Sequence, residues 1–116
     1  RTLNLSRKAR GDWAEDLVAR HYAQLGFEIV ARNYRFKGGE LDVVALKGSL
    51  LVVCEVKARM RDTHGAPAEA VTPDKQMRIR RGAIVFIRDQ GMSGVRLRFD
   101  VASVLGTKLE MFSEAF

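Results

Sequence analysis

The sequence predicts an α/β domain in which a central mixed sheet is flanked by helices, in the order α-β-β-β-α-β-β. Three observations indicate this fold class. A helical repeat of apolar residues comes first, a tight β-hairpin follows it, and a capped second helix leads into two more strands. The chain has 116 residues, of which 47% are hydrophobic. That length suits one core and hardly two, so we expect a single domain over residues 1–116.

The first helix is expected from Ser6 to Leu25. Its apolar residues recur at intervals of three and four and form one stripe: Ala9, Trp13, Ala14, Leu17, Val18, Tyr22 and Leu25. Ser6 is suited to cap the helix, and Gly26 is a natural stop after it. The segment from Phe27 to Phe36 is rich in aromatic and β-branched residues and is therefore expected to form a strand.

A β-hairpin is the next expected unit. Gly38-Gly39 breaks the chain, and strands are expected from Leu41 to Leu46 and from Leu50 to Lys57, joined by the turn Lys47-Gly48-Ser49. The pattern is lost from Ala58 to Thr72, which predicts a loop with a short helical turn around Ala68 to Val71.

The second helix begins at a clear signal. Thr72 is expected as its N-cap, Pro73 as its first residue, and Gly91 as its end. Two last strands are expected from Val95 to Leu105 and from Lys108 to Phe112. With the second helix as the crossover, the first of these strands can pair in parallel with the hairpin.

The positive charge is concentrated in one part of the chain. Twenty Lys and Arg residues stand against fourteen Asp and Glu residues, a net charge of +6. The stretch from Lys57 to Arg98 holds ten basic and four acidic residues, and the remainder is neutral overall. Such asymmetry favours a polyanionic partner, a nucleic acid or an anionic membrane surface. The alternative is a basic domain without such a partner.

Composition excludes several classes of protein. No apolar run approaches the roughly 20 residues that a membrane-spanning helix needs. The basic N-terminus lacks the apolar core of a secretory signal, so a cytoplasmic location is expected. Cys54 is the single cysteine, and His21 and His64 lie far apart in sequence. A bound metal would therefore need carboxylate ligands.

Charged residues in the hairpin are the main candidates for chemistry. Hairpin loops of two or four residues both place Asp42 directly opposite Glu55, with Cβ atoms about 5 Å apart. Two carboxylates this close repel each other, so Lys57, a divalent cation or both must balance them. Glu40 shares a face with Asp42 and is a further candidate ligand. Hard carboxylate oxygens suit Mg²⁺ or Mn²⁺. The alternative is a structural salt bridge to Lys57.

Two helix residues are expected to reach the same end of the sheet. Glu15 lies at the edge of the first helix's apolar stripe. Lys75 lies in the first turn of the second helix, on the side of Ile79, where it could meet a phosphate. The alternatives are an ion pair within the first helix for Glu15 and a solvated lysine for Lys75.

Further basic residues are candidates for binding phosphates without reading bases: Arg59, Arg61, Arg78, Arg80 and Arg81. A solvated helix face is the alternative for any one of them. Asp100 shares a strand face with Arg98, which predicts an ion pair, and a role of Asp100 in the site is the alternative. Cys54 is on the opposite face from Glu55 and is expected to pack in the core.

The pattern resembles a nuclease motif. Gly39-Glu40-Leu41-Asp42 followed by Glu55-Val56-Lys57, on adjacent strands after a helix that carries a Glu, is similar to the PD-(D/E)XK superfamily with its restriction-endonuclease-like fold. That superfamily includes archaeal Holliday junction resolvases. Over nearly its full length the chain resembles the YraN-like family of bacterial proteins, through Gly11–Glu15, Arg32–Arg35, Lys75 and Arg98–Val101 as well.

The resemblance implies a metal-dependent phosphodiesterase. Asp42 and Glu55 would hold Mg²⁺ or Mn²⁺ together with the Val56 carbonyl, and Lys57 would orient or activate the attacking water. Glu15 would be an outer ligand or a ligand to a second metal. The superfamily's proline before the Asp is Leu41 here.

We therefore expect a Mg²⁺- or Mn²⁺-dependent endonuclease acting on DNA more than on RNA, with branched or structured DNA as the resolvase-like substrate. One alternative is a non-catalytic nucleic-acid-binding module on a nuclease fold. A weaker one is a protein-interaction domain whose hairpin charges are plain salt bridges. A homodimer is expected by analogy with resolvases.

Overall fold

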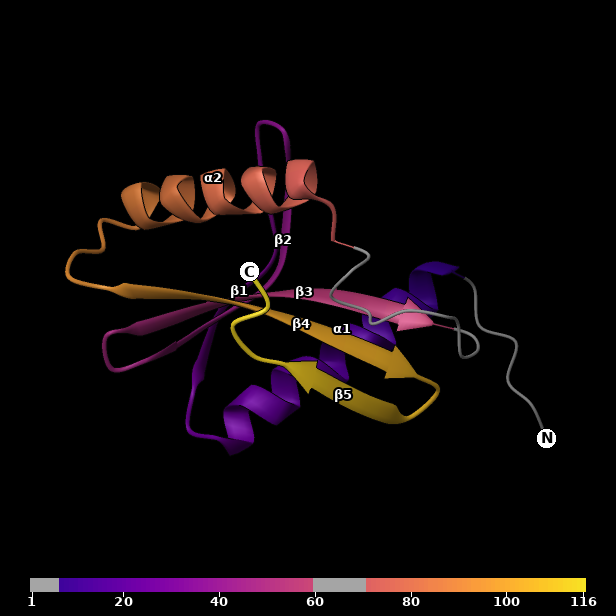
Figure 1. Cartoon of the computed structure of the whole chain (residues 1–116). Helices are drawn as coiled ribbons and strands as arrows, with labels where there is room; N and C mark the ends of the chain where they lie inside the picture. The colour runs from indigo at the N-terminus through magenta and orange to yellow at the C-terminus, as the bar shows by residue number, and fades with distance from the viewer. Residues whose placement is uncertain (1–6, 60–70) are drawn as a thin grey trace.

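A computed structural model describes residues 7–59 and 71–116 of the chain (Figure 1). The elements follow the expected order: α1 (Arg7–Gln24), β1 (Glu28–Phe36), β2 (Gly39–Lys47), β3 (Leu50–Arg59), α2 (Pro73–Asp89), β4 (Arg96–Leu105) and β5 (Lys108–Phe112). The predicted cap at Ser6 and the predicted helical turn at Ala68 to Val71 involve residues outside these ranges.

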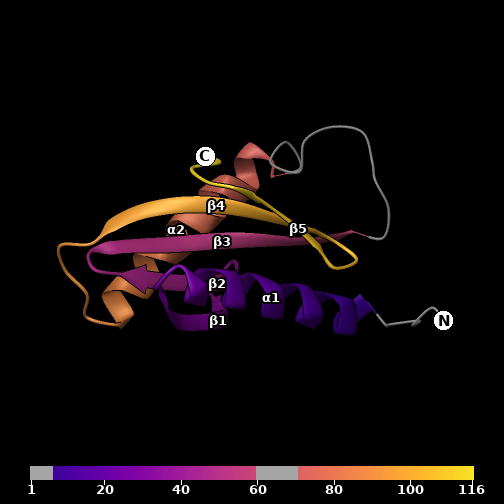
Figure 2. The same ribbon diagram turned by 90° about the horizontal axis from the view of Figure 1, so that it is seen from below.

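The five strands form one mixed sheet in the order β1-β2-β3-β4-β5. The β3–β4 pair is parallel, and the other three pairs are antiparallel. The helix α2 makes the crossover between the two parallel strands, as the sequence predicts. Figure 2 shows α1 on one face of the sheet and α2 on the other. The α/β fold class with a central mixed sheet between helices is confirmed.

Each face of the sheet has its own hydrophobic core. Against α2, the sheet contributes residues such as Val53 and Phe99, which pack with Phe86 of the helix. Against α1, it contributes residues such as Val52 and Cys54. Cys54 is fully buried there, as expected, and burial raises the pKa of its thiol. No helix of the described residues is long and apolar enough to cross a membrane.

The buried stripe of α1 is narrower than its sequence predicts. Ala14, Val18 and Tyr22 are buried, and they recur every four residues. Trp13 and Leu25 were expected in this stripe, but they are 45% and 49% exposed. The helix lies on the sheet along the single line of Ala14, Val18 and Tyr22, so Trp13, to one side of that line, remains largely in solvent.

A capping interaction fixes the first turn of α2. The Thr72 hydroxyl accepts a hydrogen bond from the backbone N–H of Lys75 at 3.2 Å, and Pro73 is the first helical residue. Both features confirm the prediction. This cap is at the end of the helix near the charged residues of the hairpin. It therefore also fixes the backbone position of Lys75.

Close packing between α2 and β1 depends on Gly82. A Cβ at this position would lie 2.6 Å from Cζ of the Phe36 ring, far inside normal contact distance. The aromatic ring therefore occupies the space that any other residue's side chain would need. Gly82 lets α2 lie close to the end of β1, next to the turn that begins β2.

We expect Gly82→Ala to destabilise the protein by about 1–3 kcal/mol, because the added methyl group displaces Phe36 or the helix. Gly11→Ala on α1 is the matched control, since a Cβ there has no neighbour within 4 Å. It should stabilise by roughly 0.5–1 kcal/mol, the usual gain for Ala over Gly in a helix. Chemical denaturation of both variants measures the difference, and equal effects would contradict this account of Gly82.

A candidate metal and phosphate site

The site is at the point where β2 and β3 separate. The pairing of these strands runs from Lys47 opposite Leu50 to Val43 opposite Cys54. This is the register that the sequence predicts, and it makes Asp42 and Glu55 the next pair. Beyond that point the ladder is replaced by a side chain, because the Asp42 carboxylate accepts the Val56 backbone N–H at 2.8 Å. Figure 1 shows β2 running away from β3 toward the turn that joins it to β1.

The strand β2 changes face at Asp42. Regular alternation would place Leu41 and Val43 on one side, yet Leu41 packs in the α2 core and Val43 in the α1 core. On the neighbouring strand, Asn33 lies between the residues paired with Leu41 and Val43 and has a φ of 53°. A left-handed Asn next to the turning point is a locally strained conformation, of the kind often found at functional sites.

Three carboxylates meet at this turning point. Single oxygen atoms of Glu15, Glu40 and Asp42 all lie within 4.8 Å of one another. Glu15 comes from α1 and is 9% exposed, whereas the other two come from β2. Glu55 of β3 is 7% exposed and is close enough to Asp42 to perturb its ionisation. All four predicted acidic residues are thus at one end of the sheet.

Burial and crowding hold Asp42 in an unusual state. Burial, followed by the negative charge of Glu55, raises the pKa of Asp42 to about 8, although the bond from Val56 opposes the shift. Burial also raises the pKa of Glu15, against hydrogen bonds and charge from Asn33 and Arg32. A nearby cation would favour the ionised forms of both Asp42 and Glu15, because it balances their negative charges.

Two lysines lie beside Glu55. The Lys75 ammonium group is 3.1 Å from the Glu55 carboxylate. Burial and the positive charge of Lys75 lower the pKa of Lys57. Burial also acts to lower the pKa of Lys75, but its contacts with Lys57 and Glu55 outweigh this and raise it. The two lysines and Glu55 thus form one interacting group of charges.

Comparison with known proteins identifies the family of this chain. Residues 14–104 match the family described as "Uncharacterised protein family UPF0102". The chain belongs to the UPF0102 family. A UPF0102 protein of Rhodococcus jostii is 47% identical over 97 residues, covering 84% of this chain and 82% of the relative. One of Acidothermus cellulolyticus is 41% identical over 113 residues, covering 89% and 86%. The resemblance to YraN-like proteins is confirmed at the level of this family.

Asn33 and Arg32 are residues of the site that the sequence interpretation did not single out as functional. The Asn33 side-chain amide donates to Glu15 at 2.9 Å. The Arg32 guanidinium lies 3.6 Å from Glu15 and 2.7 Å from Asp16. Together they connect β1 to α1 and aim Glu15 at Asp42. An Asn within a strand-forming run was the one local signal, since Asn is depleted in strands and tolerates a left-handed conformation.

The other predicted basic residues are distributed differently. Arg78 and Arg81 are exposed on α2, and Arg61 lies outside the described residues. Arg80 stacks over the rings of Phe99 and Phe116, at 4.8 and 5.5 Å, so it has a packing role. Arg59 follows Lys57 on the same face of β3 and lines a pocket beside the site. Nucleic-acid binding by Arg59, Arg78 and Arg81 stays a prediction.

Asp100 belongs to a separate, structural network. It is fully buried and accepts hydrogen bonds from the hydroxyl of Tyr22 at 2.6 Å and from the backbone N–H of Glu114 at 3.0 Å. Arg98 donates two more, at 3.0 and 2.9 Å, which confirms the predicted ion pair. Asp100 faces α1, whereas Glu55 and Lys57 face α2, so the sheet separates it from them.

The donor set of the UPF0102 chain fits a hard divalent cation. Glu15, Glu40 and Asp42 supply carboxylate oxygens, which Mg²⁺ and Mn²⁺ prefer, and no thiol or imidazole in the described residues joins the cluster. Lys57 and Lys75 add positive charge directly beside it. Carboxylates for a cation next to ammonium groups for an anion are the combination needed to bind and polarise a phosphodiester.

Proposed function

We propose that this chain is a Mg²⁺- or Mn²⁺-dependent phosphodiesterase that cleaves nucleic acid, DNA in preference to RNA. One observation carries the proposal. Glu15, Glu40 and Asp42 converge from two elements within 4.8 Å, beside a buried Glu55 that is held by Lys75. A structural salt bridge accounts for Glu55 and Lys75, and looser ion pairs join Glu15 to Arg32 at 3.6 Å and Glu40 to Arg35 at 3.5 Å. None of these pairs accounts for the buried Asp42, which lies beside three other carboxylates and accepts the Val56 backbone N–H. The preference for DNA follows from the resemblance to resolvases.

In this proposal each side chain has a defined task. Asp42 and Glu55 hold the cation, with Glu15 and Glu40 as further oxygen donors. When bound, the cation lowers the pKa of coordinated water and neutralises charge on the phosphate. Lys57, whose pKa is lowered by burial and by Lys75, orients or activates the attacking water. The Lys75 ammonium group pairs with Glu55 and stabilises charge on the phosphate.

The test is cleavage of matched linear and branched DNA, and of RNA, with Mg²⁺ or Mn²⁺. We expect DNA cleavage that falls by about 100-fold or more in Asp42→Ala and Glu55→Ala, the loss typical of removing a group that stabilises the transition state. Asp12→Ala is the control, because Asp12 is an exposed carboxylate on α1 that pairs with Lys8. Equal activity in all variants would overturn the assignment of the site.

A non-catalytic nucleic-acid-binding module is distinguished by the cation. If calorimetry finds no binding of Mg²⁺ or Mn²⁺ while DNA binding persists, the phosphodiesterase proposal is wrong and the binding module replaces it. A cytoplasmic location is a further part of the proposal. A domain of this size covers little duplex, so we further propose that two copies act together as a homodimer on branched DNA.

Asn33 provides a test of how Glu15 is held. Asn33→Gly removes the amide that donates to Glu15, and glycine accepts the φ of 53° without strain. We expect the affinity for Mn²⁺ to fall by about 10-fold, as for other residues that orient a metal ligand. Titration calorimetry with Mn²⁺ measures this. Glu15→Gln should lower the affinity at least as much, and a loss in Glu15→Gln with none in Asn33→Gly would contradict the positioning role.

A further inference from the structure

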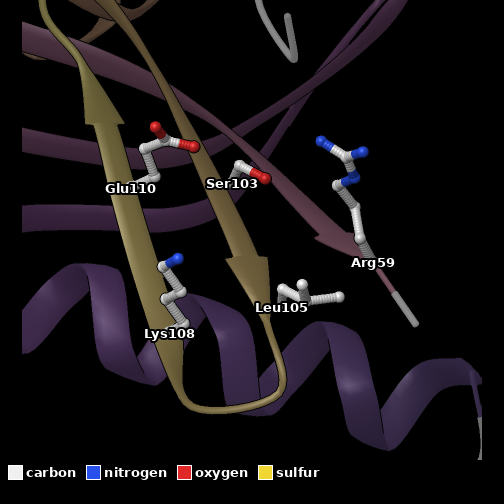
Figure 3. A pocket seen from close by; sticks show the side chains of 5 residues that line it. All are labelled: Arg59, Ser103, Leu105, Lys108 and Glu110. Carbon is white, nitrogen blue, oxygen red and sulfur yellow. The ribbon is translucent and has the colours of Figure 1, made fainter. Parts of the chain in front are cut away.

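A shallow pocket of about 40 Å³ opens beside the candidate site, at the ends of β3 and β4 and the start of β5. It is lined by Arg59, Ser103, Leu105, Lys108 and Glu110 (Figure 3). In Figures 1 and 2 both β3 and β4 extend past the first turn of α2, so the helix does not cover this part of the sheet. None of these residues belongs to the carboxylate cluster or to either hydrophobic core.

The pocket is on the same face as Lys57 and adjoins it. Lys57 pairs with Ser103 across the parallel strands, and Arg59 pairs with Leu105. Paired residues on neighbouring strands lie roughly 4.8 Å apart, and the step from Lys57 to Arg59 along the strand is roughly 6.6 Å. Ser103 in turn is opposite Glu110 on β5. The pocket therefore continues the line of Glu55 and Lys57 along β3 and extends it sideways to β5.

The side chains that line the pocket carry groups that can bind an anion. Two cationic groups, from Arg59 and Lys108, come from strands on opposite sides of β4 (Figure 3). The hydroxyl of Ser103, a residue only 5% exposed, lies between the side chains of Glu110 and Arg59. Guanidinium, ammonium and hydroxyl groups are the usual donors to phosphate oxygens. Glu110 is the one acidic group of the lining and lowers its affinity for an anion.

We propose that this pocket binds a backbone phosphate that adjoins the phosphate at the Asp42–Glu55 site. The inference rests on the proposed function, in that the ligand is a nucleic-acid strand. The strand passes from Lys57 along the end of β3 and β4 to Lys108 of β5. Glu110, as the acidic residue of the lining, weakens this contact. Phosphate contacts of this kind add affinity and register without reading the base sequence.

The test uses the two exposed residues of β5 that line the pocket, Lys108 and Glu110, so that folding is not at risk. Affinity for a fluorescent DNA is measured by anisotropy in EDTA, over a range of salt concentrations. Lys108→Ala should weaken binding several-fold and reduce the salt slope by about 1, the loss of one phosphate contact. Glu110→Gln should strengthen binding several-fold. Arg96→Ala is the matched control, because it removes the same charge from the exposed start of β4.

The opposite signs at Lys108 and Glu110 are the decisive result. Equal affinity in Lys108→Ala and Arg96→Ala, or no gain in Glu110→Gln, would overturn the inference. Either of these results can be obtained with a protein that cleaves DNA normally. In that case the phosphodiesterase proposal stands and only the pocket is refuted. Conversely, a wild-type protein that binds DNA but does not cleave it with Mg²⁺ or Mn²⁺ refutes the proposed function, while the ranking of affinities still supports the pocket.

Discussion

Asp42→Asn is expected to raise the melting temperature of the cation-free protein at pH 8 and to abolish DNA cleavage at the same time. The amide oxygen can still accept the Val56 N–H, so the local structure is kept. What the substitution removes is an ionisable group whose pKa is raised to about 8 by burial and by Glu55. Crowded, buried carboxylates destabilise the fold while no cation balances them, so neutralising one of them should stabilise it.

The sign of the pH dependence follows from the direction of this shift. In the unfolded chain an Asp has a pKa of about 3.9. A carboxyl group whose pKa is raised in the folded state binds its proton more tightly there. This tighter proton binding stabilises the folded state fully below about pH 4, and the stabilisation is lost as the pH rises through 8. The free energy of unfolding of the wild type should therefore fall over this range, and that of Asp42→Asn should fall less.

A shift from about 3.9 to about 8, at about 1.4 kcal/mol per pKa unit, sets an upper limit of about 5–6 kcal/mol on the difference between the two proteins at pH 8. Solvent around the site and relaxation of the structure reduce it, so we expect a difference of about 2 kcal/mol. Thermal unfolding at pH 5 and pH 8, with EDTA or with Mn²⁺, measures it. Mn²⁺ should stabilise the wild type and have little effect on Asp42→Asn. Asp12→Asn, at an exposed position of α1, is the control. A wild type more stable than Asp42→Asn at pH 8 in EDTA would contradict the account.

The hairpin and its charges could be predicted because local rules decide them. The turn at Gly48-Ser49 sets the register, and the register alone makes Asp42 and Glu55 neighbours. Alternation then places Lys57 on the same face as Glu55. The capping residues Thr72 and Pro73 similarly determine where α2 begins, and with it the position of Lys75.

Features that depend on how elements pack could not be predicted in this way. Trp13 was assigned to the core from its spacing, but the spacing does not say how wide a strip of α1 the sheet covers, and the residue is exposed. The partnership of Asn33 with Glu15 joins residues 18 positions apart on different elements. The change of face at Asp42 breaks the alternation on which strand predictions rest.

The buried network around Asp100 explains why a charged residue can occupy the middle of β4. Its carboxylate receives two bonds from Arg98, one from the Tyr22 hydroxyl and one from the backbone of Glu114. Glu114 has a left-handed φ of 51°, and the next residue donates its backbone N–H to Phe99 at 2.8 Å. Asp100 thus ties together α1, β4 and the C-terminal turn, which no pairwise pattern in the sequence could reveal.

Asp100→Ala is accordingly expected to cost about 3–5 kcal/mol, because it leaves the partly buried Arg98 guanidinium without its partner. Tyr22→Phe removes one hydrogen bond and should cost about 1 kcal/mol. Adding Arg98→Met to Asp100→Ala should recover part of the loss, since no orphaned charge then remains. Urea unfolding measures all three. A cost below 1 kcal/mol for Asp100→Ala would contradict the structural role, and so would a rate of DNA cleavage that falls in Asp100→Ala at temperatures where it remains folded.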